Sequence, residues 1–393
     1  MLKLIIWLPI FFLPSLQLAR FFGLTAPNTI LLLVPFFLLV FRAQLFNRSS
    51  AGLLLCAFLL LINATLTNTI SSILLGLVLC LVFFVTAYKF RFYDPRIPAR
   101  IVALVSLINA FFCVLQIYYP AVGLSNTNLD YDLSSAVTSS LSSAFAFIPS
   151  LGRLRGIFNE NGPMVLYLLL YTIFLAKLLP VFKSKRGEHF SKGDNFLFQL
   201  AIFVNVLAIV LTGSKTIVLA VPVLILLFID QNAKGPLSSL PYFMQKLRRN
   251  PVLVFATIYL SLFLLINAIP IIVDFLLGAV LQGFVGIESR LSTDALRFTL
   301  FSNQGLLPSA EGEADSLSAY HIYTYAFGSL LSALLLSSYL FFVSRITSCY
   351  LYLLLVLIAF LASGSLLIPF YTQAILLASS TPAPLPLKMN FSE

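Results

Sequence analysis

Charged residues are scarce in this chain: only 10% of its 393 residues are Asp, Glu, Lys or Arg, whereas 60% are hydrophobic. Soluble globular domains carry about 25% charged residues, so this composition argues against a soluble protein. A mean hydropathy of +1.00 and 38 Phe against a single Trp favour a surface that faces lipid. We therefore predict an all-α fold in one integral-membrane domain that spans 1–393, since backbone groups in lipid must bond within their own helix.

Histidine and cysteine, the residues that most often bind metals or form disulfides, are also few. The sequence has two His, which makes a multi-His metal site implausible within it. Its four Cys all lie inside apolar runs without disulfide or metal spacing, and we read them as buried thiols. The net charge of +10 lies mostly in the connectors between apolar runs, so it indicates membrane topology rather than nucleic-acid binding. We predict no metal, no other cofactor and no nucleic-acid partner.

Long apolar runs dominate what is present. A transmembrane helix needs about 20 mostly apolar residues, and about 11 or 12 such spans are predicted. The candidate spans lie near 4–19, 23–41, 51–65, 69–88, 101–119, 163–182, 196–213, 216–230, 252–280, 319–343 and 348–379. The last run contains Ser363, Gly364 and Pro369, and it reads equally as one tilted helix or as a tight hairpin.

Basic residues concentrate in alternate connectors, and this alternation sets the predicted topology. The basic connectors are 42–50, 89–100, 183–195 and 231–251, with Arg345 on the same side. The positive-inside rule makes these cytoplasmic, together with the N-terminus. Two long loops, 120–162 and 281–318, then lie on the outer, periplasmic side. The stretch 284–301 of the second loop is amphipathic and predicts an interfacial helix.

Cations on the outer side are not explained by topology. The segment 152–163 reads GRLRGIFNENGP and leads directly into a predicted span. Arg153 and Arg155, with Asn161 and the free N–H groups of a helix start, suit an anion such as phosphate. The alternative is that both arginines contact lipid headgroups.

Three further cations fall on the same side. Lys215 lies in a very short turn between two apolar runs, where it either faces a polar cavity or snorkels to the surface. Arg290 and Arg297 are seven residues apart and would share one helix face. They form either a phosphate-facing stripe or ion pairs with neighbouring acids.

Two residues near the start of the tenth run are candidate bases. His321 opens that run after an acidic approach that includes Asp315. A histidine or carboxylate at the mouth of a cavity can take a proton from a hydroxyl group. The alternative is that His321 is an interfacial residue that bonds a backbone carbonyl.

The order of these features resembles the O-antigen polymerase and O-antigen ligase superfamily of bacterial inner membranes. The segment 153–161 is similar to that family's neighbourhood of Arg, Gly and Asn, and the turn 212–216 resembles its Ser-Arg/Lys-Ser/Thr signature. Arg290 and the residues after it resemble the start of the family's large periplasmic loop. The segment 315–328 resembles the stretch that leads into the family's next transmembrane helix. His321 lies only seven residues before Gly328, a departure that favours a polymerase over a ligase.

The resemblance implies a GT-C-like fold and a metal-independent, inverting glycosyltransferase. Its substrate would be an oligosaccharide repeat unit on a polyprenyl diphosphate, and a chain-length regulator is a conceivable partner. By this resemblance Arg153, Arg155, Lys215, Arg297 and Asn161 would bind the diphosphate. Arg290 would stabilise the developing charge, and His321 or Asp315 would be the base.

Two rival functions remain. A ligase of the same fold would transfer the finished chain to lipid A-core. The sequence contains no motif that distinguishes this acceptor from a growing chain. A flippase for lipid-linked sugars would predict two similar halves and charges near the bilayer midplane. The halves here are unlike, and the unexplained cations lie at one face. We therefore rank polymerase first, ligase second and flippase third.

Overall fold

The fold is helical throughout the part of the chain that the structure describes. The computed structural model describes residues 94–118, 154, 156–158, 161–183, 192–212, 217–232, 250, 256, 329–347, 349–362 and 368–381. Its elements are α6 (Arg96–Tyr118), α8 (Asn161–Lys183), α9 (Lys192–Leu211), α10 (Ile217–Asn232), α17 (Ser329–Ile346), α18 (Tyr350–Ala362) and α19 (Ile368–Ser380). Within these ranges the prediction of an all-α fold is confirmed.

Three of these helices are long and apolar enough to cross a membrane. The qualifying stretches are Arg96–Gln116 of α6, Gly162–Leu179 of α8 and Gly193–Leu211 of α9. Helices α6 and α8 have 23 residues each, about 34 Å at the usual rise per residue. That length exceeds the hydrocarbon thickness of a bilayer, about 30 Å. A membrane protein is therefore indicated by length and composition.

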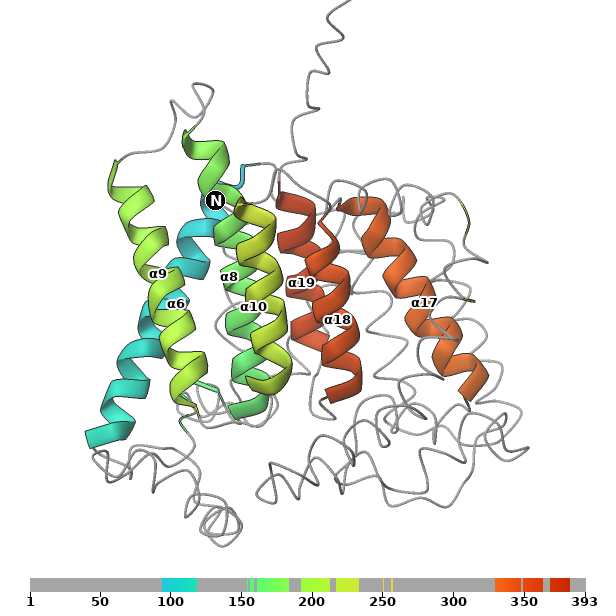
Figure 1. Cartoon of the computed structure of the whole chain (residues 1–393), viewed down its shortest axis with the longest axis horizontal. Coiled ribbons are helices and arrows are strands. Elements are labelled where there is room, and N and C mark those ends of the chain that lie inside the picture. The colour runs from blue at the N-terminus through green and yellow to red at the C-terminus, as the bar shows by residue number, and fades with distance from the viewer. Residues whose placement is uncertain are drawn as a thin grey trace, which may run out of the picture.

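Helix α8 lies at the centre of the described bundle. It packs against α6, α9, α10, α18 and α19, and Figure 1 shows it behind α10 and beside α6. In its apolar stretch 78% of the residues are buried, against 33% in that of α9. The outer face of α9 instead exposes Phe196, Phe203 and Val210. Such an apolar exterior is typical of a helix that faces lipid.

Two ion pairs and one amide contact fix the relative directions of four helices. Arg100 near the start of α6 bonds Asp194 near the start of α9, so these two helices run in the same direction. Lys177, near the end of α8, bonds Asp230, near the end of α10, so these two helices also run in the same direction. Gln116, late in α6, bonds Gly156 just before α8.

The described bundle therefore has two distinct ends. One, the ion-pair end, holds the pairs Arg100–Asp194 and Lys177–Asp230. The other, the α8-entrance end, holds Gln116 and the first turn of α8. Since α9 runs parallel to α6, its last residues also lie at the α8-entrance end. Since α10 runs parallel to α8, its first residues lie there too.

The start of α6 shows how local sequence sets a helix boundary. The Asp94 carboxylate accepts a hydrogen bond from the backbone N–H of Arg96 at 3.0 Å, and Pro95 directly precedes α6, with its carbonyl accepting from the Ala99 N–H at 3.1 Å. Proline suits a helix start because it has no N–H to leave unbonded. An acid before a proline is a strong helix-start signal. The helix begins at Arg96, five residues before the predicted span.

The C-terminal apolar run forms two helices, which resolves the alternative left open by the sequence. Helices α18 and α19 have 13 residues each, about 20 Å, and neither reaches across a bilayer core by itself. The hydroxyl groups of Tyr352 in α18 and Thr381 after α19 lie 2.8 Å apart. The start of α18 thus meets the end of α19, as in an antiparallel hairpin.

Other predictions of the sequence are partly covered. Cys113 and Cys349 are free and buried, as expected of thiols inside apolar runs, while Cys56 and Cys80 lie outside the described residues. The predicted spans 4–19, 23–41, 51–65 and 69–88 lie outside the described residues, as does the loop 281–318. The span 252–280 is described only at residue 256.

Candidate functional site at the entrance of helix α8

A short buried segment leads into α8, and it is the candidate site. Its described members are Leu154, Gly156, Ile157 and Phe158, which we call the 154–158 segment. The side chains of Leu154, Ile157 and Phe158 are 2%, 2% and 1% exposed. The three apolar side chains anchor the segment in the bundle, and burial of each contributes about 1.5–3 kcal/mol.

Burial of this backbone creates a demand for hydrogen bonds, and α6 supplies them. The Nε2 of Gln116 donates to the Gly156 carbonyl oxygen at 2.9 Å, and its Oε1 accepts from the Gly156 N–H at 3.0 Å. The Oδ1 of Asn109 accepts from the Ile157 N–H at 3.0 Å. Buried backbone groups left unpaired would each cost about 1–3 kcal/mol. Two neutral amides of one helix thus satisfy three consecutive backbone groups.

Glycine is required at position 156 for two independent reasons. Its φ of 56° lies in the left-handed region, where a side chain is disfavoured. A Cβ atom added there would also lie 2.0 Å from the Oδ1 of Asn109. The backbone of the segment therefore approaches α6 more closely than any other residue type would allow.

Aromatic rings connect the segment to α8 and α19. The Phe158 ring stacks on that of Tyr167, with centroids 5.1 Å apart and planes inclined by 23°. The Tyr167 ring meets Phe370 of α19 edge to face at 5.2 Å. Below this column, the Tyr171 hydroxyl donates to Gln373 of α19 at 2.8 Å. The entrance of α8 is thereby tied to both α6 and the C-terminal hairpin.

The start of α8 lies directly after the candidate segment, and the first N–H groups of any helix lack partners within it. The helix begins at Asn161, two residues before the predicted span, and carries Pro163 in its first turn as expected. The first turn contains no acidic residue, but Glu160 directly precedes Asn161 in the sequence, where the partial positive charge of a helix start also favours an acid. A negatively charged group would be favoured near this position.

The predicted site residues themselves fall mostly outside the described part of the chain. Those outside it are Arg153, Arg155, Lys215, Arg290, Arg297, Asp315 and His321. Asn161 is described as the first residue of α8, without its side chain. The contacts of these side chains therefore lie outside the described residues. The structure does describe the neighbours of two of them: Leu154 lies between Arg153 and Arg155 in sequence, and Gly156 follows Arg155.

The helices on either side of the Lys215 turn end on the same side of the bundle. Helix α9 ends at Leu211 and α10 begins at Ile217, both at the α8-entrance end. Thr212, the last described residue before the turn, is fully buried and donates from its hydroxyl to the Ile209 carbonyl at 2.9 Å. Two of the predicted cation-bearing connectors, 153–161 and 212–216, thus join helices at one end of the bundle.

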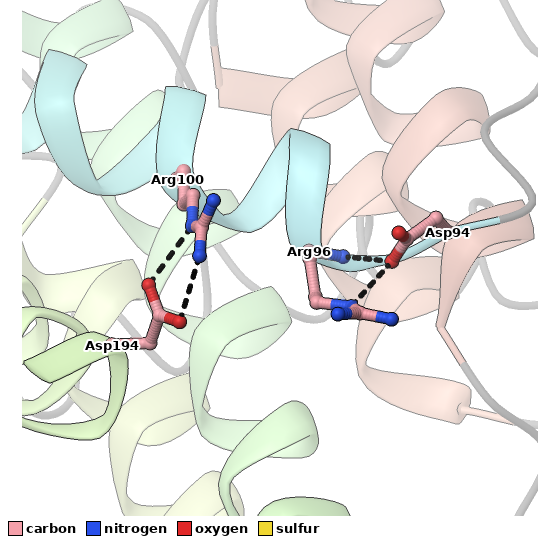
Figure 2. Close-up of polar contacts among 4 residues, drawn as sticks. All are labelled: Asp94, Arg96, Arg100 and Asp194. Carbon is pink, nitrogen blue, oxygen red and sulfur yellow. Dashed lines mark hydrogen bonds and ion pairs between the residues drawn. The ribbon is translucent and has the colours of Figure 1, made fainter. Parts of the chain in front are cut away.

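The opposite end of the bundle is built differently, with charged side chains. Figure 2 shows Arg100 facing Asp194, whose two carboxylate oxygens each accept from the guanidinium at 2.9 Å. Asp94 and Arg96 form a second pair beside it, in which both side chains are partly exposed. Lys177 and Asp230 pair between α8 and α10, with side chains 23% and 19% exposed.

Sequence reasoning missed both kinds of contact. Asn109 and Gln116 do not figure among the predicted site residues, although their spacing of seven places both on one helix face. Lys177 and Asp230 were likewise overlooked. An isolated charge inside an apolar run is costly, and that cost is a signal that a partner exists on a neighbouring helix.

One further pair of acids was missed, and it bears on metal chemistry. Asp130 and Asp132 form an Asp-x-Asp pair in the loop 120–162, and two such carboxylates are suitable hard ligands for Mg²⁺. Both lie outside the described residues. Among the residues that the structure does describe, no group of three His, Cys, Asp or Glu side chains is close enough to hold a metal ion.

Comparison of the chain with models of protein families, with curated proteins and with solved structures gave no match. The function is therefore argued from the residues and their geometry.

Proposed function

We propose that this protein is a bacterial inner-membrane glycosyltransferase that polymerises oligosaccharide repeat units linked to polyprenyl diphosphate. In this proposal the chain crosses the membrane about 11 or 12 times, with its N-terminus in the cytoplasm and the loops 120–162 and 281–318 in the periplasm. The apolar composition and the three long apolar helices support a membrane setting. The product would be a surface polysaccharide such as an O-antigen or an exopolysaccharide.

One observation carries the proposal: the described residues next to the two unexplained arginines in sequence, Leu154 and Gly156–Phe158, are buried in the bundle. A loop whose arginines merely touched headgroups would need no fixed backbone. Here Gly156 and Ile157 are buried and hydrogen-bonded to α6 at 2.9–3.0 Å, and Gly156 adopts a left-handed conformation. A buried backbone that requires a glycine and is hydrogen-bonded to a neighbouring helix has a defined position, which supports a binding site over a contact with headgroups.

The position of the segment agrees with the proposed topology. The ion-pair end contains Arg96 and Arg100, which belong to a basic connector that the positive-inside rule assigns to the cytoplasm. The α8-entrance end is the opposite one, and in the proposal it faces the periplasm. A lipid-linked diphosphate would reach this end from the bilayer, while its sugars extend into the polar space outside.

The chemistry would proceed as a single displacement. The acceptor sugar hydroxyl attacks the anomeric carbon from the face opposite the diphosphate, the bond from that carbon to the diphosphate oxygen breaks, and the anomeric centre inverts. His321 or Asp315 takes the hydroxyl proton. Arg153, Arg155, Lys215 and Arg290 stabilise the charge that develops on the leaving diphosphate, with Arg297 and Asn161 as further contacts.

Genetic complementation tests the activity. Deletion of the gene should leave lipopolysaccharide with a single repeat unit on the core, and a ligase would instead leave bare core with lipid-linked polymer accumulating. Arg155→Ala and Arg290→Ala should fail to restore chain extension although the protein inserts normally. Arg345→Ala is the matched control, because Arg345 is an exposed arginine at the end of α17 that contacts the Phe341 ring. Full extension with Arg155→Ala would remove that residue from the site.

Headgroup binding is the specific alternative for Arg155. Purified protein in phosphatidylcholine nanodiscs should bind undecaprenyl diphosphate, and Arg155→Ala should weaken this binding about 10-fold or more, the usual effect of losing one charge-assisted hydrogen bond. Adding phosphatidylglycerol should compete poorly. Equal competition by that lipid would favour the headgroup interpretation over a diphosphate site.

Metal independence is tested separately. Chain extension by purified enzyme should survive exhaustive chelation of divalent ions, since cationic side chains take the electrostatic role. Loss of activity that added Mg²⁺ restores would contradict this mechanism. In that case Asp130→Asn together with Asp132→Asn should reproduce the loss, and the Asp-x-Asp pair would become the candidate metal site.

A further inference from the structure

Two neutral side chains of α6 bind the backbone immediately beside the arginine pair. Gln116 contacts both the N–H and the carbonyl of Gly156, and Asn109 contacts the N–H of Ile157. Asn109 and Gln116 are 1% and 8% exposed, so their amides are removed from competing water. Hydrogen bonds in such surroundings are stronger and more costly to lose than those at a surface.

These bonds do something that the apolar contacts of the segment do not. Burial of Leu154, Ile157 and Phe158 favours the segment's location but is non-directional. A hydrogen bond is directional and specifies which peptide group lies against which side chain. The bonded N–H of Gly156 belongs to the planar peptide unit that joins it to Arg155, so the contact with Gln116 acts on the chain directly next to that arginine.

The neutrality of the two amides also matters. A carboxylate at position 109 would satisfy the Ile157 N–H equally well, and one at position 116 would satisfy the Gly156 N–H but not the Gly156 carbonyl, because it has no donor. Either carboxylate would also attract nearby guanidinium groups and compete with a phosphate for them. At the ion-pair end the same bundle does use carboxylates against cations. At the α8 entrance the described contacts are made by amides, which hold the backbone without adding a negative charge of their own.

We propose that Asn109 and Gln116 are positioning residues, which hold the 154–158 segment so that the adjacent arginines grip the diphosphate of a lipid-linked substrate. This inference rests on the proposed function. Neither amide touches the reacting atoms; both act through the backbone of Gly156 and Ile157. Loss of either should therefore weaken diphosphate binding and raise KM for the lipid-linked donor, with a smaller effect on kcat.

The test uses matched buried amides in the full-length protein in phosphatidylcholine nanodiscs. Gln116→Met removes the contacts with Gly156 at similar side-chain volume. Gln373→Met is the control, since Gln373 is also a buried glutamine in a helix but bonds Tyr171 instead. The readouts are the affinity for undecaprenyl diphosphate as probe, the KM and kcat for chain extension, and the thermal unfolding midpoint.

We expect Gln116→Met to weaken probe binding about 10-fold and to raise KM by a similar factor. This factor corresponds to the net free energy of about one hydrogen bond. The control Gln373→Met should lower the unfolding midpoint to a similar degree without changing probe affinity. If Gln116→Met does not yield folded protein, Asn109→Ala replaces it, because it leaves the Gln116 contacts in place.

The outcomes separate the two proposals. If Arg155→Ala weakens probe binding but Gln116→Met and Asn109→Ala behave like Gln373→Met, the positioning role is wrong and the diphosphate site stands. If Arg155→Ala binds the probe as the unaltered protein does, the proposed site itself is wrong, and the positioning role falls with it.

Discussion

The two ends of the described bundle are held together by different chemistry. At the ion-pair end, Arg100 pairs with Asp194 and Lys177 with Asp230, so charges of opposite sign join neighbouring helices. At the α8-entrance end, neutral amides of α6 hold a buried glycine-containing backbone. The first arrangement neutralises its cations within the protein. The second fixes a backbone beside arginines and supplies no carboxylate among its described contacts.

The difference indicates which end is structural and which is a candidate site. Paired charges on the helices themselves stabilise helix packing and have no charge to offer a ligand. A rigid backbone next to cations keeps their charge for a ligand and reduces the entropy lost on binding. Substitutions at the two ends should therefore have different signatures, and the following experiments are ordered from the largest expected effect to the smallest.

The largest effect is expected for Gly156→Ala at the α8-entrance end. The left-handed backbone should cost an alanine about 1–2 kcal/mol, and overpacking against Asn109 typically adds about 1–3 kcal/mol. The measurement is the unfolding midpoint and the folded fraction in detergent. Gly193→Ala is the control, because Gly193 is exposed in the first turn of α9. Equal stability of the two variants would contradict the close approach of Gly156 to α6.

A double variant sharpens that result. Asn109→Ala combined with Gly156→Ala removes the side chain that the new Cβ would meet at 2.0 Å. The double variant should be less destabilised than the sum of the two single variants, since the steric part of the cost disappears. Strict additivity would show that the left-handed backbone alone accounts for the effect.

The next largest effect is expected for Lys177→Met at the ion-pair end. It leaves the mostly buried Asp230 without its partner, and the cost should be about 2 kcal/mol, below the 3–5 kcal/mol of fully buried pairs. Lys177→Met combined with Asp230→Leu should regain much of this loss, because no unpaired charge then remains. The unfolding midpoint is the measurement, and a double variant less stable than both single variants would contradict the pair's role.

Asp194→Asn should have a smaller effect, about 1 kcal/mol. The substitution keeps one oxygen acceptor but removes the charge that pairs with Arg100 and that favours the start of α9. Arg100→Lys should cost less still, because its side chain is 58% exposed and the surroundings screen the charge. An unfolding midpoint lowered more by Arg100→Lys than by Asp194→Asn would show that the bidentate geometry outweighs the charge.

The smallest effect is expected at Asp94. Asp94→Ala removes the cap of α6 and should cost about 0.5–1 kcal/mol, whereas Asp94→Asn keeps a capping oxygen and should be nearly neutral. The pair with Arg96 has two half-exposed side chains, so water screens it and it should contribute little. Equal destabilisation by both variants in thermal unfolding would assign the effect to the ion pair instead of the cap.

Part of the site could have been predicted from the sequence, and part could not. The segment 152–163 was singled out because its arginines violate the positive-inside pattern, which is a local property of composition and order. The partners of that segment were not foreseen. A polar residue such as Gln116 in an apolar run predicts that its side chain is hydrogen-bonded. The partner cannot be predicted, because it depends on how α6 is rotated and on which backbone segment lies beside it.

By itself, the sequence determined that this is a helical protein suited to a membrane, and it located the described helices to within a few residues apart from the start of α17. It could do so because hydropathy and helix-start signals act over neighbouring residues. The tertiary structure alone decided that α8 is central, that the last apolar run folds back as α18 and α19, and that Gly156 rests on Asn109 and Gln116. These features depend on contacts between residues far apart in the chain, for which local sequence carries no direct signal.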